Sequence, residues 1–384
     1  MSDLFLTEEE KLLQNMVRDF SEQELAPKAD ELDSTQEFPW EAMKAMGDLG
    51  LFGVGVDPEY GGTGGGAREL AIVAEELTRC CGATSLTWIA HVSLAIQNIH
   101  AFANDAQKKK YLPELISGEK IGAFGLSEPG MGSDAAALQT SAKKTDGSYL
   151  INGSKTWITN GDFADTFVVY ATMDPEKRSR GITAFIVERE FGGLEAQSLG
   201  TKMGMRASDT AQVFLQDVPV PQENLMGAEG EGFKIAMLTL DSSRITIAAQ
   251  AVGFAQAALE AAIQYSKQRK SFGVPISDHQ GIQFKLAEMA TRVEASRLMV
   301  RNAAMLRDAG LPFIKEACMA KFYASASATY CTNEAVQVHG GIGYFKPTLV
   351  ERLYRDAKVT EIYEGTSEVQ RMVIARHVLG KMGG

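Results

Sequence analysis

Hydrophobic and polar residues follow three different patterns along the chain. Up to about residue 120 and again after about residue 228, apolar positions recur at the spacing of amphipathic helices. Between these two parts lie short runs rich in β-branched and aromatic residues, separated by glycine-containing turns. The pattern predicts an α+β protein with an N-terminal α-helical domain at 1–120, a central antiparallel β domain at 121–227 and a C-terminal helical bundle domain at 228–384.

The N-terminal part begins with a helix start signal and contains one glycine run. Thr7 followed by three glutamates at 8–10 is typical of an N-cap with an acidic first turn. The run 61–67 contains a formal GxGxxA, the pattern of a dinucleotide-binding turn. The tripeptide at 58–60 separates it from the preceding apolar run, and no acidic residue ends a second strand at the expected distance. We therefore interpret the run as a structural turn.

Short β-rich runs define the central domain. They are Tyr149–Ile151, Thr166–Ala171, Ile182–Val187 and Ala211–Leu215. Asp146-Gly147 and Asn152-Gly153 predict tight turns between them. Helices alternating with these strands are absent from the pattern, which disfavours a doubly wound nicotinamide-binding sheet.

Long helices are predicted after Pro219 and Pro221, at about 230–267, 280–309 and 312–339. A helical bundle is the simplest arrangement for them.

Composition narrows the classes of function. With 384 residues and 45% hydrophobic content, the chain can bury a substantial core in two or three domains. The net charge of -11 and the lack of a dense basic run argue against nucleic acid as a partner. The start at residues 1–3 has no signal-peptide character, and we expect no membrane span because no apolar stretch looks long enough. Four cysteines without CxxC spacing and scattered histidines predict a cytoplasmic protein without a metal site.

One carboxylate has the sequence context of a catalytic base. Glu364 follows an apolar pair and precedes a Gly-Thr-Ser turn. Burial beside the apolar pair would raise the pKa of Glu364 towards working pH, and Gly365 lets the backbone approach a ligand. The alternative is an acidic residue before a helix, with Thr366 or Ser367 as N-cap and Glu368 in the first turn. Local chemistry leaves both interpretations open.

Five sequence blocks in a fixed order resemble one enzyme family. They are 124–133 (FGLSEPGMGS), 157–161 (WITNG), 269–273 (RKSFG) with His279 and Gln280, 337–341 (QVHGG), and 362–371 (IYEGTSEVQR). In this order and at these distances they resemble the acyl-CoA dehydrogenases, and the resemblance extends over essentially all 384 residues. It implies a helical domain, a β domain and a C-terminal four-helix bundle, with a flavin between the last two.

The resemblance also implies an activity. Family members remove the α-proton of an acyl-CoA thioester with a glutamate while the β-hydride passes to N5 of FAD, giving a trans-2-enoyl-CoA. Glu364 matches that base, and its backbone N–H together with a ribityl hydroxyl would stabilise the thioester oxygen. An electron-transferring flavoprotein as partner and a homotetramer built as a dimer of dimers are implied as well.

Residues in every block match cofactor contacts. They are Phe124, Leu126, Ser127, Ser133, Trp157, Thr159, Arg269, Phe272, His279, Gln280, Gln337, Gly340, Gly341, Thr366 and Glu368. The contacts at 269–280 belong to a subunit interface, so one cofactor site would need two chains. Phe124 stands where a tyrosine is frequent, which keeps ring packing and loses a hydroxyl. Ordinary core packing is the alternative for Trp157, and solvated charge is the alternative for Arg269.

Four residues match the substrate side of the family's site. They are Ser133, Asp241, Arg244 and Gly365. A helical ion pair is the alternative for Asp241 and Arg244. Ser243 occupies the position where isovaleryl- and long-chain-type members carry their glutamate, so the chain resembles the short- and medium-chain, butyryl-CoA dehydrogenase-like subgroup. Trp88 is predicted near the floor of the acyl pocket.

Two other functions stay open at this point. One is an acyl-CoA oxidase that uses the same base and passes electrons to dioxygen. The other is a non-catalytic scaffold that binds flavin or CoA on this fold.

Overall fold

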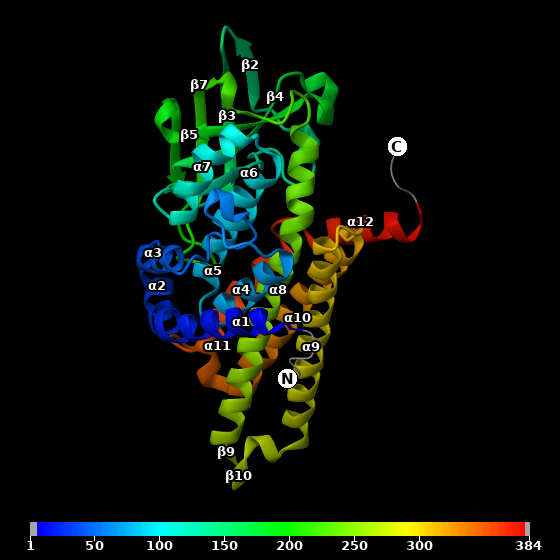
Figure 1. Ribbon diagram of the computed structural model, residues 1–384. Coiled ribbons are helices and arrows are strands. Elements are labelled where there is room, and N and C mark those ends of the chain that lie inside the picture. Colours follow the sequence, from blue (N-terminus) through cyan, green and yellow to red (C-terminus); the bar gives the residue numbers. More distant parts are fainter. Residues whose placement is uncertain (1–5, 381–384) are drawn as a thin grey trace.

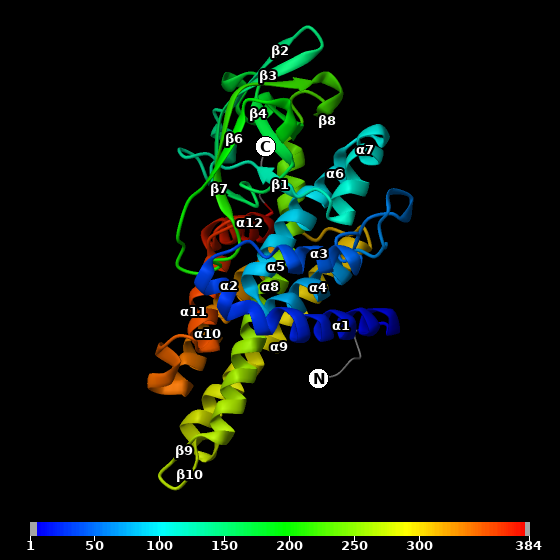
Figure 2. The same ribbon diagram turned by 90° about the vertical axis from the view of Figure 1, so that its left-hand side faces the viewer.

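The computed structural model describes residues 6–380, so the prediction about residues 1–3 lies outside the described part. The molecule is elongated, with the β-sheet at one end and a helical tip at the other (Figure 1). In both views α8 runs from the sheet end to the tip, and the N-terminal helices pack beside its middle (Figure 2). The sheet and the tip are therefore at opposite ends of one long helix.

The N-terminal part is helical, as predicted. Its helices are α1 (Glu8–Phe20), α2 (Ala29–Thr35), α3 (Trp40–Asp48), α4 (Ala67–Cys80), α5 (Gly82–Ile89), α6 (Gln97–Phe102) and α7 (Asp105–Ser117). Thr7 and Glu10 form the expected capping box, in which each side chain accepts from the other residue's backbone N–H, at 3.2 and 2.7 Å. The glycine run forms a turn that leads into α4 without a preceding strand, in agreement with its interpretation as structural.

Within the described residues the central part forms one eight-stranded sheet. Its strands are β1 (Gly122–Gly125), β2 (Ser141–Thr145), β3 (Ser148–Thr159), β4 (Thr166–Thr172), β5 (Ile182–Glu188), β6 (Leu194–Ser198), β7 (Thr210–Pro221) and β8 (Leu225–Met226). The order is β6-β7-β3-β2-β4-β5-β8, with β1 beside β4. Most pairs are antiparallel, as predicted, while β1 and the end of β2 pair with β4 in parallel.

One of the two predicted turns is wrong. Asp146-Gly147 does connect β2 and β3, with Gly147 at φ 80°. Asn152-Gly153 lies inside β3 instead, where the pairing with β7 shifts register. A Cβ at position 153 would lie 2.6 Å from Oγ1 of Thr140, so only glycine fits this close approach. The Asn-Gly pair signals a bulge here because the strand continues on both sides of it.

The C-terminal part contains the three predicted long helices, followed by short ones. The elements are α8 (Gly232–Gln268), β9 (Lys270–Ser271), β10 (Val274–Pro275), α9 (Gln280–Asp308), α10 (Ile314–His339), α11 (Leu349–Ala357) and α12 (Ser367–Val378). α8, α9 and α10 pack on one another, and the shorter α11 and α12 pack against α10. The predicted domain boundaries, at 120/121 and 227/228, stay predictions.

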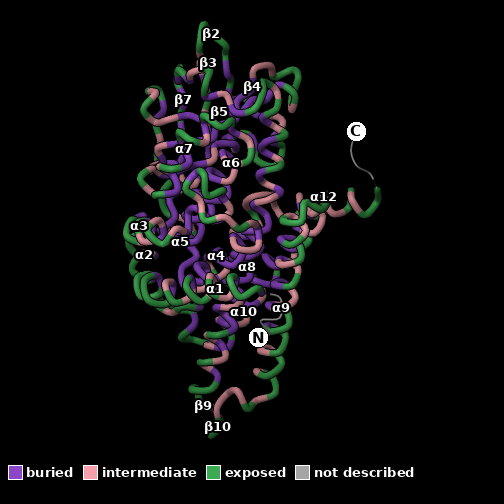
Figure 3. Tube along the Cα trace, in the orientation of Figure 1, coloured by how far each residue is buried: buried purple, intermediate pink, exposed green. Residues whose placement is uncertain are grey.

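α8 corrects one premise of the sequence analysis. It is long and apolar enough to cross a membrane, with a mean hydropathy of 1.3 in its most apolar window. Of that window 83% is buried inside the protein, as in the central helix of a core. Length and composition do not distinguish a membrane-spanning helix from a buried core helix, but the burial of α8 inside the protein explains its apolar composition (Figure 3).

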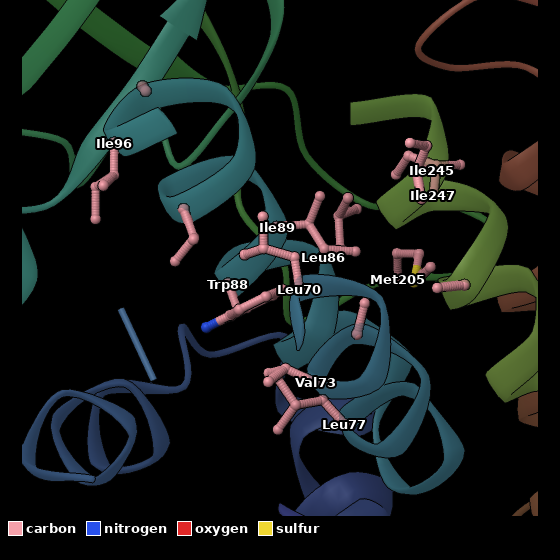
Figure 4. Packing of buried hydrophobic residues seen from close by; sticks show 14 of the residues in the cluster. Leu70, Val73, Leu77, Leu86, Trp88, Ile89, Ile96, Met205, Ile245 and Ile247 are labelled. Atoms are coloured by element: carbon pink, nitrogen blue, oxygen red, sulfur yellow. The ribbon is translucent and has the colours of Figure 1, made fainter. Parts of the chain in front are cut away.

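Trp88 belongs to the helical core. Its side chain is fully buried, and its indole N–H donates to the carbonyl oxygen of Leu51 at 3.1 Å. Figure 4 shows the indole pointing towards the N-terminal segment, away from Ile245 and Ile247 of α8. The structure therefore shows that Trp88 packs in the core, and its predicted place near the floor of the acyl pocket stays a prediction. Replacing it by glycine would remove about 3–5 kcal/mol of core packing, which makes that substitution a poor probe of chain length.

A buried histidine fixes the sheet to the helical part. His91, in the π-helical turn η5 (Ala90–Ile96), contacts the carbonyl oxygen of Leu115 through Nε2 at 2.9 Å. Its Nδ1 accepts from the backbone N–H of Gly122 in β1, also at 2.9 Å. Burial lowers the pKa of His91 to about 4, so the ring is neutral with its proton on Nε2. This ring joins the end of α7 to the first strand.

Candidate functional site

Glu364 lies on a left-handed turn between the 3-10 turn η12 (Lys358–Glu361) and α12. Its φ is 48° and that of Gly365 is 95°. A non-glycine residue in this region is strained, and such strain persists only where neighbouring groups hold it. Thr366 caps α12 by accepting from the N–H of Val369 at 3.3 Å, and Glu368 lies in the first helical turn. The structure thus confirms the alternative in which Thr366 caps α12. The same segment also holds Glu364 in a left-handed backbone conformation.

The Glu364 carboxylate is enclosed by polar groups from two helices. Ser243 Oγ donates to its Oε2 at 2.5 Å. Burial raises the pKa of Glu364 to about 7, although the Ser243 hydroxyl and the charges of Lys321 and Arg244 pull it down. The residue keeps partial exposure while its carboxylate is desolvated. A carboxylate in this state can accept a proton at neutral pH.

Lys321 of α10 contacts the residue after the base. Its Nζ donates to the Gly365 carbonyl oxygen at 2.7 Å, and Gln370 Nε2 donates to the same oxygen at 2.9 Å. The backbone N–H of Glu364 has no acceptor among residues 6–380. That free donor is available to a ligand that reaches the turn.

Asp241 and Arg244 form the helical ion pair considered as their alternative role. Both are buried on α8, and Arg244 Nη1 also lies 3.6 Å from Sγ of Cys318. Burial raises the pKa of Asp241 above its ordinary value, against the pull of Arg244. Nε of Arg244 has no hydrogen-bond partner in the described chain. Their predicted contact with substrate stays a prediction.

Gln250 and Tyr363 form a second polar contact beside the base. Gln250 is fully buried two helical turns after Ser243 on α8, and its Oε1 accepts from the Tyr363 hydroxyl. Its Nε2 has no hydrogen-bond partner in the part of the chain described. Tyr363 directly precedes Glu364 in the chain, and burial, followed by the charge of Glu364, raises the pKa of the Tyr363 hydroxyl.

The cofactor candidates of the central domain lie on β1, in the loop after it and on β3. Phe124 is half-buried at the end of β1, and the loop carries the half-buried Ser127, the buried Leu126 and the exposed Ser133. The Phe124 ring packs at 5.2 Å from that of Tyr170. At Gly130 and Gly132 an added Cβ would meet no atom within 4 Å. The loop therefore offers open backbone and hydroxyl groups to a ligand.

Trp157 is on the surface, so the core alternative is wrong for it. Its side chain is 69% exposed, and its φ of 60° lies in the left-handed region. The pairing of β3 with β7 shifts register between Lys155 and Ile158, which turns the indole out of the strand pattern. Thr159 is half-buried two residues further along β3. An exposed indole on a strained bulge is a ready stacking surface for a planar group.

A buried ion pair that the sequence analysis missed holds this loop on β3. Lys155 Nζ lies 2.8 Å from Oε1 of Glu128 and 3.2 Å from the Leu126 carbonyl oxygen. Glu128 also accepts from the N–H groups of Gln139 and Thr140, at 2.7 and 2.9 Å. Burial raises the pKa of Glu128, but Lys155 and these donors outweigh it and hold the pKa below its usual value. Burial lowers the pKa of Lys155 to about 8, so both groups are charged at neutral pH.

The remaining cofactor candidates lie at the opposite end of the molecule. They are the exposed Arg269, Phe272, Gln280, Gln337, Gly340 and Gly341, and the half-buried His279. The side chain of Phe272 is 95% exposed. Tyr265 and His339 stack at 4.2 Å, which joins the end of α8 to the end of α10 at this tip. In one chain the tip lies at the other end of α8 from the sheet that carries Trp157 (Figure 1).

Three residues near Glu364 were not predicted as part of its site. Ser243 was discussed only because relatives of other subgroups have a glutamate at this position, and Gln250 and Lys321 were not considered. One signal was present: Lys321 interrupts an alanine stripe at helical spacing on α10, where a lysine needs a specific partner.

Within residues 6–380 no group of three or more His, Cys, Asp or Glu side chains could hold a metal ion.

Three family models match consecutive parts of the chain. They are described as the acyl-CoA dehydrogenase N-terminal domain (residues 7–119), middle domain (residues 123–218) and C-terminal domain (residues 230–379). The short-chain specific acyl-CoA dehydrogenase of Clostridium acetobutylicum is 48% identical over 373 residues, covering 97% of this chain and 98% of that protein.

Solved structures agree with these matches. Butyryl-CoA dehydrogenase from Megasphaera elsdenii superposes with a TM-score of 0.95 at 44% identity, covering 97% of this chain and 99% of that one. A chain from work on the electron transferring flavoprotein of Acidaminococcus fermentans and flavin-based electron bifurcation gives 0.96 at 44% identity, covering 98% and 100%. The protein is thus an oxidoreductase with the predicted fold class. It belongs to the acyl-CoA dehydrogenase family.

We predict that Lys155→Met will weaken cofactor retention and stability together. The substitution leaves the buried Glu128 carboxylate without its cation, which typically costs about 3–5 kcal/mol. The measurements are the flavin-to-protein absorbance ratio of the purified protein and its denaturant unfolding. Lys143→Met, which removes an exposed lysine of β2, is the control and should change neither. A Lys155→Met protein with full flavin content and wild-type stability would contradict the role of this pair.

Proposed function

We propose that this protein catalyses the FAD-dependent α,β-dehydrogenation of a short-chain acyl-CoA to the trans-2-enoyl-CoA. The observation that carries the proposal is the Glu364 carboxylate, desolvated on a strained turn with its pKa raised to about 7. A general base works best when its pKa lies near the operating pH. An ordinary surface glutamate would be a far weaker base.

Glu364 takes the α-proton of the thioester onto its carboxylate. The free backbone N–H of Glu364 donates to the thioester oxygen, where negative charge develops as that proton leaves. FAD, when bound, supplies the acceptor for the hydride that leaves the β-carbon. Ser243 holds the carboxylate in one orientation until the substrate arrives.

The residues of the central domain fit a flavin. The exposed Trp157 offers an aromatic face, and Gly130 and Gly132 leave room for close approach of a planar ring. Ser127, Ser133 and Thr159 supply hydroxyl groups for its polar edge. The flavoprotein character of the family supports this assignment.

The positions of the cofactor candidates favour a site shared between two chains. Trp157 belongs to β3 of the sheet, while Arg269 and Phe272 flank β9 at the tip of the molecule (Figure 1). A second copy has to supply the tip residues if both sets contact one FAD. The Phe272 ring is almost fully exposed and is therefore available to a second chain. We propose a homotetramer arranged as a dimer of dimers.

Gln250 and Tyr363 support a short acyl chain. Their hydrogen bond places an amide and a phenol beside the base, where a longer acyl chain would have to displace buried polar groups. The similarity to a short-chain specific enzyme and to a butyryl-CoA dehydrogenase points the same way.

We further propose an electron-transferring flavoprotein as the electron acceptor. The similarity to a chain from work on such a flavoprotein supports it. The dehydrogenases of Clostridium acetobutylicum and Megasphaera elsdenii described above give no support to the oxidase alternative. The predicted cytoplasmic location stays a prediction, with which four buried free thiols are compatible.

The base assignment predicts that Glu364→Gln abolishes turnover but keeps the flavin. The amide cannot accept the α-proton, so anaerobic bleaching of the visible flavin band by butyryl-CoA should slow by at least about 1,000-fold. Glu31→Gln, which changes an exposed glutamate of α2, is the control and should behave as wild type. Full turnover by Glu364→Gln would place the base elsewhere. A yellow wild-type protein that no acyl-CoA bleaches would favour the scaffold alternative.

The chain-length assignment predicts a shift in Gln250→Ala. Removing the amide opens space beside Tyr363, so the preferred substrate should move from butyryl-CoA towards longer acyl chains. The measurement is kcat/KM across saturated acyl-CoAs from butyryl to palmitoyl. Gln264→Ala, at an exposed position of the same helix, should leave the profile unchanged. An unchanged profile in Gln250→Ala would remove this residue from the acyl pocket.

A further inference from the structure

Lys321 is a fully buried lysine on a helix face that otherwise holds small apolar residues. The neighbours on this face of α10 are Ala317, Ala320, Ala324 and Ala328, each also fully buried. Taking an ammonium group out of water is costly unless the charge has a partner. A methionine would fill the same space without that cost. The lysine at this position therefore calls for a specific interaction.

That interaction is with the peptide that follows the base. Lys321 Nζ and Gln370 Nε2 donate to the Gly365 carbonyl oxygen, at 2.7 and 2.9 Å. Glu364 and Gly365 are both left-handed, and a Cβ at position 365 would lie 2.6 Å from Gln370 Nε2. Side chains from two helices, α10 and α12, thus stabilise the strained turn through hydrogen bonds to the same carbonyl oxygen.

Lys321 also supplies charge to the carboxylate. Burial lowers the pKa of Lys321 to about 8, with Glu364 the main group opposing that change. At neutral pH Lys321 is charged. Burial raises the pKa of Glu364 to about 7, and the charge of Lys321 opposes this increase. The other titratable or charged groups that interact with Lys321 are Arg244 of α8, Glu361 of η12, Cys318 of α10 and Glu368 of α12.

We propose that Lys321 is the positioning residue of the base: it fixes the Gly365 carbonyl, and hence the turn that presents Glu364, and it favours the ionised carboxylate that accepts the proton. The inference rests on the proposed function, since it assigns Lys321 to the same proton transfer. When the α-proton moves to Glu364, the charge of the pair changes from zero to plus one. The hydrogen bond to Gly365 keeps this positive charge at the turn whose Glu364 N–H is proposed to contact the thioester oxygen.

Three substitutions separate the hydrogen bond from the charge. Lys321→Met removes both, Lys321→Gln keeps a donor for Gly365 without the charge, and Lys321→Arg keeps donor and charge. Lys358→Met is the matched control, because it removes a lysine of η12 that pairs with Glu361 at the surface. All variants are studied as the flavin-loaded full-length protein.

The first readout is the pH dependence of flavin reduction by butyryl-CoA at low substrate concentration. Loss of an opposite charge raises the pKa of a carboxylate, so the acid limb should move up by about one pH unit in Lys321→Met and Lys321→Gln. Lys321→Arg should restore the limb towards its wild-type position, and Lys358→Met should leave it in place. A residue with a merely structural role would lower the rate without moving this limb.

The second readout does not depend on turnover. Hydrogen exchange of the segment 361–370 should speed up in Lys321→Met and stay closer to wild type in Lys321→Gln. The protonated carboxyl band of Glu364, isolated by infrared difference between each protein and its Glu364→Gln derivative, should titrate at higher pH in Lys321→Met and Lys321→Gln.

Two results would overturn the assignment. One is an acid limb and a Glu364 titration that stay at the wild-type pH in both Lys321→Met and Lys321→Gln. The other is wild-type hydrogen exchange of 361–370 in Lys321→Met. Should Lys321→Met not fold, Lys321→Gln carries the charge test by itself. If butyryl-CoA does not reduce the wild-type flavin, the proposed function fails, while the infrared titration still decides whether Lys321 controls Glu364.

Discussion

The desolvated carboxylate of Glu364 is the feature that the surrounding structure has to stabilise. Desolvation raises the pKa of Glu364, and the left-handed turn beneath it would relax without external support. Ser243 from α8 orients the carboxylate, and Lys321 from α10 holds the adjacent peptide. These are two of the three long helices in the described part of the chain, so the Glu364 carboxylate is held by regular secondary structure and not by a loop.

The same long helix separates two groups of predicted cofactor residues. α8 begins beside the sheet and ends at the exposed tip that carries Phe272, so its length sets the distance between them (Figure 1). A helix rises about 1.5 Å per residue, and α8 has 37 residues. In the proposed function, a second chain supplies the tip residues to a cofactor that binds at Trp157, so cofactor binding would depend on assembly.

Periodicity was enough to predict the fold, because three helices of 26 to 37 residues leave a long signal in the sequence. It failed at Asn152-Gly153, where a turn signal forms a bulge within a continuing strand. The site was predictable as far as its contiguous blocks, which include Glu364 and Trp157. The partners of Glu364 were not, since Ser243 and Lys321 reach the turn from residues 121 and 44 positions away. Such contacts depend on how helices pack, which a local pattern does not encode.

The most direct test is the pH dependence of flavin reduction by butyryl-CoA, measured by anaerobic stopped flow at low substrate concentration between about pH 5 and 9. Only ionised Glu364 accepts the proton, so the second-order rate should rise with pH and reach half its maximum near pH 7, the pKa to which burial raises this group. A rate that does not change over this range, or a midpoint near the ordinary glutamate value of 4.5, would contradict a desolvated Glu364 as the base.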